Sequence, residues 1–273
     1  MKKKYFNVAA LAAVSILTFF PLLWTFSNSF KSAEKIIRQP LNIVPEFLDF
    51  RNFIGVLTQA PFDLYIVNSI VTAVIIVALQ MLIAILIGYG LSRFEFKGKK
   101  FMFAAILLTY MLPPAATYVP SYVILAKMNL IDSLAGIIIS NAASVFAIYM
   151  IYQAFLTIPR ESVEAAQMDG ANNWQILWKV MVPLSKSTIL TTALIQCVAM
   201  YNNYMWPSLI TNSRKNYLVS VGLNIFFNSR GNFTQNLPML MAANTVSVLP
   251  LLILFLVLQK WFIKGISDSG LKG

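Results

Sequence analysis

Long apolar runs separated by short polar segments dominate the chain. Six runs contain no charged residue, and each exceeds the roughly 20 residues that a helix needs to cross a bilayer. They are 5–30, 64–92, 101–126, 133–159, 187–213 and 231–259. The runs are continuously apolar and lack the alternation that is typical of barrel strands. The pattern therefore predicts an all-α membrane protein with six transmembrane helices.

Prolines set several ends of these predicted spans. Pro113-Pro114 and Pro120 remove helical hydrogen bonds, so the third span should end or kink there, with a second short helix over 118–127. Trp206-Pro207 should stop the fifth span. The predicted spans are about 7–28, 65–91, 101–120, 134–156, 187–207 and 239–259. No linker is long enough to separate two domains, so residues 1–273 are predicted to form a single transmembrane domain.

Composition and charge support a membrane location and suggest an orientation. Hydrophobic residues make up 58% of the chain and charged residues 11%, whereas soluble domains carry about 25% charged residues. With both termini inside, the cytoplasmic segments hold 13 of the 21 Lys and Arg residues, while the ten acidic residues divide equally. This asymmetry predicts an N-in, C-in topology. It also accounts for the net charge of +11, so no nucleic-acid partner is expected.

The sequence offers little for catalysis or metal binding. It contains no His, and its one cysteine, Cys197, lies in an apolar run. There is no Gly-x4-Gly-Lys-Ser/Thr phosphate loop and too little polar sequence to house an ATPase domain. We therefore predict no catalytic residue, no metal site and no cofactor bound by this chain. The six runs also lack the ionisable residues that ion-coupled carriers keep within the membrane, which disfavours that class.

The polar segment 157–186, between spans 4 and 5, differs from the rest of the chain. Pro159 suits the first turn of a helix, and Glu161 and Glu164 would then complement the helix dipole near its N-terminus. Asp169-Gly170 should end that helix, because Gly tolerates the left-handed conformation. A first short helix is therefore predicted on the cytoplasmic side.

A second short helix should follow directly. Asn172 or Asn173 can cap it, Trp174 to Val182 would form it, and Pro183 would end it. Two helices joined by Gly would make an elbow lying along the membrane surface. The residues alone leave two interpretations open: a surface that a partner protein binds, or an amphipathic connector packed on lipid headgroups.

The order of residues in this elbow forms a specific motif. It reads Glu164-Ala165-Ala166, Gly170, Val180, Val182 and Pro183. This spacing resembles the signature of bacterial ATP-binding-cassette importer permeases, although that family more often has Ile and Leu at the two aliphatic places. In the family the elbow is the coupling helix, which sits in a groove of the cytoplasmic ATPase. The resemblance implies a coupling role for Glu161, Glu164, Ala165, Ala166, Asp169, Gly170 and Ala171.

Other segments extend the resemblance over nearly the full length. Pro21-Leu22-Leu23-Trp24 with Ser29-Phe30-Lys31 resembles the first span of sugar-importer permeases of the maltose-transporter type. Tyr201-Asn202-Asn203-Tyr204-Met205-Trp206-Pro207 resembles their fifth-span motif, usually Trp-Asn-Glu-Phe-Leu-Trp-Pro. The ending from Gln259-Lys260-Trp261-Phe262 resembles the tail of the smaller permease subunit, and it implies that Gly270, Lys272 and Gly273 reach the ATPase.

The resemblance also implies partners and a location. The partners would be a second homologous permease, two copies of a cytoplasmic ATP-binding subunit that use ATP and Mg, an extracytoplasmic solute-binding protein, and membrane lipid. The location would be the bacterial plasma (inner) membrane. The chain itself would transport solute by alternating access and would not be an enzyme.

Polar side chains within the spans suggest a passage. Unpaired polar groups are costly in lipid, so they should face other helices or a water-lined cavity. We expect Asn141 and Ser144 to share a helix face, and likewise Gln196 and Asn203. The candidate passage residues are Asn141, Ser144, Gln196, Tyr201, Asn203, Tyr204, Asn244 and Ser247. Interhelical hydrogen bonding is the alternative role for each of them.

Three functional hypotheses follow. The uncharged, aromatic-containing passage favours a permease for a neutral sugar or oligosaccharide. The second hypothesis is a permease of the same class for a glycerol-phosphodiester-like or other small polar solute. The third is an ion-coupled secondary carrier.

Overall fold

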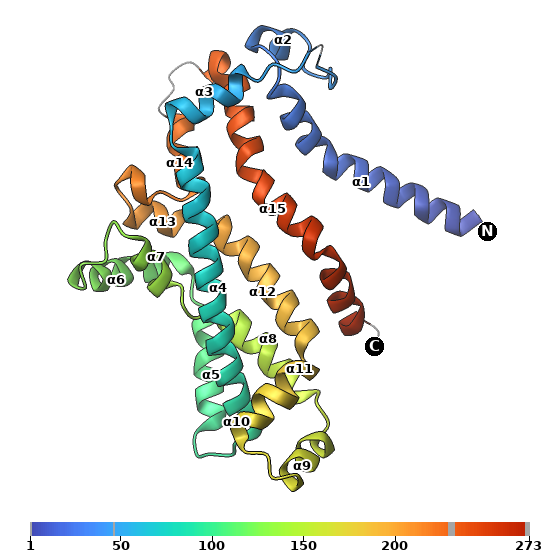
Figure 1. Ribbon diagram of the computed structural model, residues 1–273, viewed down its shortest axis with the longest axis vertical. Coiled ribbons are helices and arrows are strands. Elements are labelled where there is room, and N and C mark those ends of the chain that lie inside the picture. The colour runs from blue at the N-terminus through green and yellow to red at the C-terminus, as the bar shows by residue number, and fades with distance from the viewer. Residues whose placement is uncertain (1, 46, 229–232, 271–273) are drawn as a thin grey trace. The chain divides into compact units, whose positions relative to one another are not determined.

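The computed structural model describes residues 2–45, 47–228 and 233–270 of the chain. Within these ranges every regular element is a helix (Figure 1), which confirms the all-α prediction. The helices fall into two compact units, one of Met1–Ile66 with Val219–Leu252 and one of Val67–Leu218 with Ile253–Gly273. The single domain expected over residues 1–273 stays a prediction.

The first unit contains four whole helices and parts of two long ones. These are α1 (Lys2–Asn28), α2 (Ala33–Arg38), α3 (Arg51–Gln59) and α14 (Val219–Asn228), with the first turn of α4 (Phe62–Arg93) and the first half of α15 (Phe233–Gly270).

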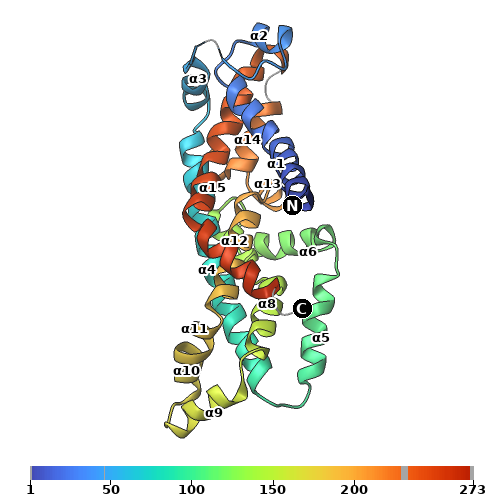
Figure 2. The same ribbon diagram turned by 90° about the vertical axis from the view of Figure 1, so that its right-hand side faces the viewer.

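The second unit holds the remaining elements (Figure 2). Besides most of α4 and the end of α15, they are α5 (Lys99–Tyr110), α6 (Pro114–Lys127), α7 (Leu134–Ser140), α8 (Val145–Leu156), α9 (Arg160–Met168), α10 (Asn173–Ile176), the π-helix η1 (Leu177–Met181), α11 (Val182–Leu184), α12 (Lys186–Tyr201), α13 (Met205–Ile210) and the 3₁₀-helix η2 (Arg214–Asn216).

Three helices are long and apolar enough to cross a membrane. They are Tyr5–Asn28, Phe62–Arg93 and Gln235–Val257. Three bent pairs pass the same test together, with bends of 99° between α5 and α6, 43° between α7 and α8, and 77° between the α10–α11 stretch and α12. By length and composition the described part of the chain therefore holds three candidate spans, or up to six if each bent pair counts as one.

The third predicted span, 101–120, is two helices rather than one. Helix α5 ends at Tyr110, and α6 starts at Pro114 instead of at the predicted residue 118. Pro113 is extended, with ψ of 129°, and Pro114 occupies the first position of α6. A proline suits that position because its N–H would have no helical partner anyway. Pro120 lies inside α6 without ending it.

The fourth predicted span is interrupted where two candidate residues lie. Asn141 ends α7, and the Ser144 hydroxyl accepts a hydrogen bond from the Ala147 N–H and so caps α8. The expectation that Asn141 and Ser144 share one helix face was therefore wrong. A new helix starts here despite the continuous apolar pattern, because the Ser144 hydroxyl accepts a hydrogen bond from a backbone N–H that has no partner within the first turn of α8.

The fifth predicted span also breaks earlier than expected. Helix α12 ends at Tyr201, and Asn203 lies in the following non-helical stretch, so it does not share a helix face with Gln196. Pro207 does not stop the span. It lies in the first turn of α13, where proline is tolerated.

In the first unit, aromatic packing joins α4 to α14. The ring centroids of Phe62 and Phe226 lie 5.3 Å apart at right angles, and Phe62 also contacts Tyr65 edge to face. Gly222 allows the close approach, because a Cβ there would lie 2.2 Å from the Tyr65 ring. The contact between α4 and α14 therefore depends on glycine at position 222, beside the packing of Phe62 on Phe226.

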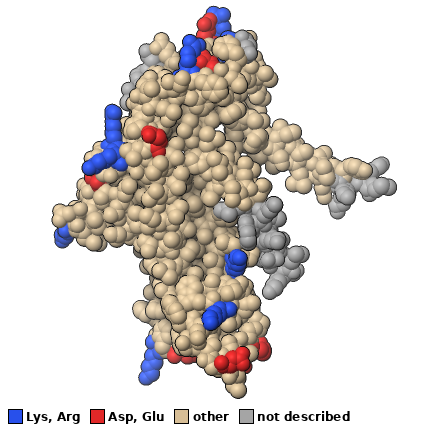
Figure 3. All heavy atoms as spheres, viewed as in Figure 1, with Lys and Arg blue, Asp and Glu red and all other residues tan. Residues whose placement is uncertain are grey.

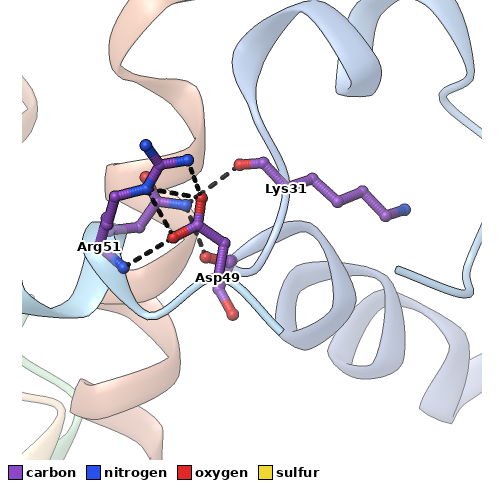
Figure 4. A network of polar contacts seen from close by, with 5 residues as sticks. Lys31, Asp49 and Arg51 are labelled. Atoms are coloured by element: carbon purple, nitrogen blue, oxygen red, sulfur yellow. Dashed lines mark hydrogen bonds and ion pairs between the residues drawn. The ribbon is translucent and has the colours of Figure 1, made fainter. Parts of the chain in front are cut away.

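Polar contacts organise the segment after α1. The Asn52 amide donates to the carbonyl oxygens of Ser29 and Lys31, at 2.8 and 3.1 Å. Asp49 and Arg51 form an ion pair at 2.6 Å, while the Lys31 ammonium points away from them (Figure 4). The hydrogen bonds from Arg51 lower the pKa of Asp49 to about 2. The Ser29-Phe30-Lys31 segment is thus held by its backbone as well as by its side chains.

Candidate functional site

The elbow comprises residues 157–186, and its first half forms as the local sequence predicts. Helix α9 ends in a Schellman motif: the Gly170 N–H donates to the Gln167 carbonyl (2.9 Å) and the Ala171 N–H to the Ala166 carbonyl (3.0 Å). Gly170 has a φ of +80°, a conformation that L side chains rarely adopt. The backbone conformation therefore favours glycine here, whereas space does not demand it, because no atom lies within 4 Å of where a Cβ would be.

The second half of the elbow starts with a capping box. The Asn172 side chain accepts from the Gln175 N–H at 2.8 Å, and the Gln175 side chain accepts from the Asn172 N–H at 2.9 Å. The helix then widens into η1 and continues past Pro183 to Leu184. Pro183 was wrongly expected to end it. The wider π turn reduces the clash of the proline ring with the preceding turn, and the ring's lack of an N–H costs little there.

Apolar side chains anchor both halves of the elbow to α4 and α8. Val163 from α9 and Ile176, Leu177 and Met181 from the second half are buried in one cluster with residues such as Phe155. The Arg93 guanidinium at the end of α4 donates to the carbonyl oxygens of Phe155 and Ile158, both at 3.4 Å. A displacement of the elbow would therefore be transmitted to α4 and α8 through packed side chains.

The structure divides the seven predicted coupling residues. Ala166 and Ala171 pack against the unit's own core and are only partly exposed. The other five lie on the exposed side: Glu161, Glu164, Ala165, Asp169 and Gly170. Figure 3 shows acidic side chains gathered at the end of the molecule where Figure 1 draws α9. The exposed side of the elbow thus carries three carboxylates, with a small residue, Ala165, among them, and it also carries the exposed cations Arg160 and Lys179.

Two large exposed residues on the elbow were missed by sequence reasoning. Met168 is 88% exposed and Trp174 is 61% exposed, on either side of the Gly170 turn. The Trp174 ring contacts Trp178 edge to face, with centroids 5.7 Å apart. The sequence did carry a signal for these two residues, because large apolar residues in the most polar segment of a chain often mark a protein contact surface.

A polar groove of about 420 Å³ lies between α6, α7, α12 and α13. Its lining residues are Pro114, Thr117, Tyr118, Ser121, Ser140, Asn141, Ala199, Met200, Asn203 and Trp206. None of them carries a formal charge. Breaks in three predicted spans therefore border the groove, because Pro114 starts α6, Asn141 follows the end of α7, and Asn203 lies between α12 and α13.

Aromatic stacking forms one wall of the groove. The rings of Tyr118 and Trp206 stack with centroids 5.4 Å apart and an interplanar angle of 27°. The Trp206 indole N–H donates to the Ser140 hydroxyl at 2.8 Å, which fixes the ring's orientation. Sequence reasoning named neither Tyr118 nor Trp206 as a passage residue. Only the bend after α5 brings Tyr118 against Trp206, so no local pattern could have paired them.

The predicted passage residues divide between the groove and other positions. Asn141 and Asn203 line the groove. Gln196 hydrogen-bonds the Ser144 hydroxyl, which links α12 to the start of α8. Tyr201 is buried, and Tyr204 precedes α13 without lining the groove.

The remaining candidates lie on α15. Asn244 and Ser247 belong to the first unit and donate to carbonyl oxygens of their own helix, at 3.2 and 2.7 Å. Gly270 is the last residue of α15, while Lys272 and Gly273 lie outside the described residues. In the described ranges no three His, Cys, Asp or Glu side chains gather closely enough to hold a metal ion.

A carboxylate fastens the two turns beside the groove. Asp132, in the turn between α6 and α7, accepts hydrogen bonds from the backbone N–H groups of Asn212 and Ser213, both at 2.9 Å. Its own N–H donates to the Ile210 carbonyl at 2.7 Å. Hydrogen bonds from the Ser213 side chain and from these amides hold the pKa of Asp132 well below its ordinary value. The turn after α13 is therefore tied to the turn before α7.

Curated relatives match this chain over nearly its whole length. The chain is 28% identical to the arabinooligosaccharides transport system permease protein AraQ of Halalkalibacterium halodurans, over 96% of this chain and 94% of the relative. It is 30% identical to the sn-glycerol-3-phosphate transport system permease protein UgpE of Yersinia pestis bv. Antiqua, over 93% and 92%.

A solved structure agrees along almost the whole chain. A bacterial ABC transporter involved in the import of the acidic polysaccharide alginate matches with a TM-score of 0.83 and 25% identity, over 95% of this chain and 96% of that one. Residues 80–268 match the family described as binding-protein-dependent transport system inner membrane component. That match covers the elbow, the groove and the breaks between them. The chain therefore belongs to the family of inner membrane permease components of binding-protein-dependent ABC transport systems.

Proposed function

We propose that this permease carries a neutral sugar or oligosaccharide through the groove between α6, α7, α12 and α13. The single observation that carries the proposal is the lining of the groove, which combines stacked Tyr118 and Trp206 with amides and hydroxyls and no charged side chain. Aromatic faces and neutral hydrogen-bonding groups suit a polyhydroxylated solute. A phosphate or an amino acid would instead need a side chain of opposite charge in the lining of the groove.

The relatives support a carbohydrate and also supply the second candidate. AraQ is named for arabinooligosaccharides, and the matched ABC transporter is described as involved in the import of the acidic polysaccharide alginate. UgpE is named for sn-glycerol-3-phosphate, so a phosphate-bearing polyol is the second candidate substrate. The uncharged groove favours the first. Membership in an ABC transport family disfavours the ion-coupled carrier.

We further propose that the elbow couples transport to ATP hydrolysis by partner subunits. The chain would cross the membrane six times, as one domain with both termini in the cytoplasm, and the elbow would then face two copies of an ATP-binding subunit. Those subunits would use ATP and Mg, while this chain would have no ATPase site. The exposed acidic side of α9, together with Met168 and Trp174, is the surface that supports this proposal.

The proposed cycle is alternating access with a second homologous permease. ATP binding would close the ATPase dimer and move the elbow, and the buried cluster of Val163, Leu177 and Met181 would pass the motion to α4 and α8. A loaded extracytoplasmic solute-binding protein would deliver substrate at the other side. Hydrolysis would reverse the motion. Gly270, Lys272 and Gly273 are proposed to contact the ATPase from the end of the chain.

A pair of neighbouring asparagines tests the substrate proposal. Asn203 lines the groove, whereas the adjacent Asn202 is exposed and bonds only the Val198 carbonyl of its own helix. Asn203→Ala should raise the KM for sugar uptake about tenfold, the effect of losing one hydrogen bond to the substrate. Asn202→Ala should leave uptake unchanged. The proposal fails if the two variants transport equally well.

A pair of exposed methionines tests the coupling proposal. Met168→Ser on the elbow should reduce the substrate-stimulated ATPase activity of the assembled transporter about tenfold, as expected for an exposed apolar contact residue. Met128→Ser, an exposed apolar residue after α6, is the matched control and should retain the activity. Equal losses in both variants would mean that the elbow is not the coupling surface.

A further inference from the structure

A second cavity lies at the elbow end of the same unit. It measures about 610 Å³ and lies between the end of α4, the turn 94–98, the start of α5 and the middle of α8. The rings of Phe103 and Tyr152 form its wall, with centroids 4.6 Å apart. Lys99 and Lys100 contribute to its lining from the first turn of α5. The cavity is distinct from the sugar groove, with which it shares no residue.

Positive charge concentrates around this cavity. The stretch from Arg93 to Lys100 holds four cationic residues and one carboxylate, Glu95. The Lys99 ammonium lies 2.8 Å from that carboxylate, which neutralises a single cation. Hydrogen bonding and charge from Lys99, with smaller effects of Arg160 and Lys100, lower the pKa of Glu95. Lys100 lines the cavity and is exposed, and the ion pairs found among the described residues do not include it.

The cavity continues onto an apolar helix face. Helix α5 buries none of its residues in this chain, and Phe101, which lines the cavity, is 79% exposed. Met102 beside it is exposed as well. A ligand that fits both features must place an anion near Lys100 and hydrocarbon along α5. This combination is the chemistry of an anionic phospholipid at a membrane surface.

We propose that this cavity binds the phosphate-bearing headgroup of an anionic phospholipid, with the acyl chains lying along α5. This proposal rests on the proposed function only for the leaflet in which the lipid lies. If the elbow faces the ATPase, the lipid belongs to the cytoplasmic leaflet. Arg93 links this end of α4 to the carbonyl oxygens of Phe155 and Ile158 just before α9. A bound lipid would therefore lie beside the elbow's attachment to the core.

Lipid binding to the purified full-length chain tests this proposal. Native mass spectrometry in detergent would count phosphatidylglycerol and phosphatidylcholine adducts offered at equal concentration. The wild-type chain should retain phosphatidylglycerol preferentially. Lys100→Gln should weaken that preference about fivefold, because a Lys near an anionic surface contributes about 1 kcal/mol. Glu95→Gln should strengthen it, since Lys99 is then released to the phosphate.

Lys97→Gln is the matched control. Lys97 is an exposed lysine of the same turn that does not line the cavity, so its removal should change the preference less than twofold. Equal losses in Lys97→Gln and Lys100→Gln would overturn the proposal in favour of diffuse surface charge. No preference in the wild-type chain, or complete displacement of the lipid by millimolar inorganic phosphate, would also overturn it. Circular dichroism and gel filtration would verify that each variant folds.

The lipid measurement is separable from transport. Adducts are counted on the isolated chain without sugar, ATP or partner subunits. A negative lipid result therefore leaves the proposed import function standing. Failed sugar uptake with a retained, Lys100-dependent lipid preference would reject the proposed function alone.

Discussion

The elbow and the groove belong to the same unit but arise in different ways. In the elbow, the Gly170 turn and the Asn172–Gln175 capping box satisfy backbone groups within a few residues. In the groove, the contacts that matter join distant segments, such as Tyr118 with Trp206 and Asp132 with Ser213. Local hydrogen bonds fix the shape of the first region, and long-range packing fixes the second.

The two regions should therefore respond differently to substitution. A local motif tolerates a substitution that preserves its backbone conformation, because few other atoms contact it. A site assembled from several elements loses stability whenever one close contact is disturbed.

Gly136→Ala should have the largest effect, in the wall of helices around the groove. An added Cβ would lie 2.2 Å from the Leu130 carbonyl oxygen, so the backbone of the preceding turn must shift. We expect a loss of about 3 kcal/mol, at the upper end for overpacking. Thermal unfolding in detergent would measure it. Gly90→Ala in α4, where no atom lies within 4 Å, should be neutral or stabilising.

Ser140→Ala should destabilise the groove by about 2 kcal/mol. Trp206 is almost fully buried, and its indole N–H would lose the acceptor that it contacts at 2.8 Å, leaving a buried donor unpaired. A lower melting temperature and altered tryptophan fluorescence would report the loss. Ser121→Ala, which also lines the groove, provides the control. Similar shifts in both variants would contradict the role given to the Ser140–Trp206 bond.

Asp132→Asn should cost about 1.5 kcal/mol at neutral pH, within the range for hydrogen bonds to a charged group. The folded state lowers the pKa of Asp132, so its contribution is fully present above the unfolded pKa of about 4. It is lost as the pH falls from there towards the lowered pKa. Melting temperatures across that window should therefore converge for the two proteins. A constant difference at all pH values would contradict this assignment.

Gly170→Ala should have the smallest effect on stability. The left-handed backbone costs an Ala about 1 kcal/mol, and no neighbouring atom adds a clash. Gly170→Asn should cost less, because Asn tolerates this conformation. Hydrogen exchange of the α9–α10 amides would detect the local loss. If Asn and Ala are equally disruptive, side-chain space rather than backbone conformation limits this position.

Several features were readable from particular residues. Gly170 predicted the turn of the elbow, and Asn172 and Asn173 were the two predicted candidates for the second cap, of which Asn172 provides it. Both signals act on backbone groups close by in sequence. The charge-free runs predicted an all-helical membrane chain. The spacing from Glu164 to Pro183 indicated the family to which residues 80–268 belong.

Other features were not readable, and the failures have a shared cause. The break between Asn141 and Ser144 and the end of α12 at Tyr201 lie inside apolar runs that look continuous. Pro183 was expected to end a helix that the π turn carries past it. In each case the neighbouring elements stabilise an irregular backbone that propensity alone disfavours.

Apolar run length and capping groups act over short distances, so the residues alone predicted the helical class, the membrane character and the elbow. Which side of α9 is exposed and which residues line the groove depend on how distant elements pack. Tyr118, Ser140 and Trp206 lie far apart along the chain, and their contacts exist only once the bent helix pairs have packed.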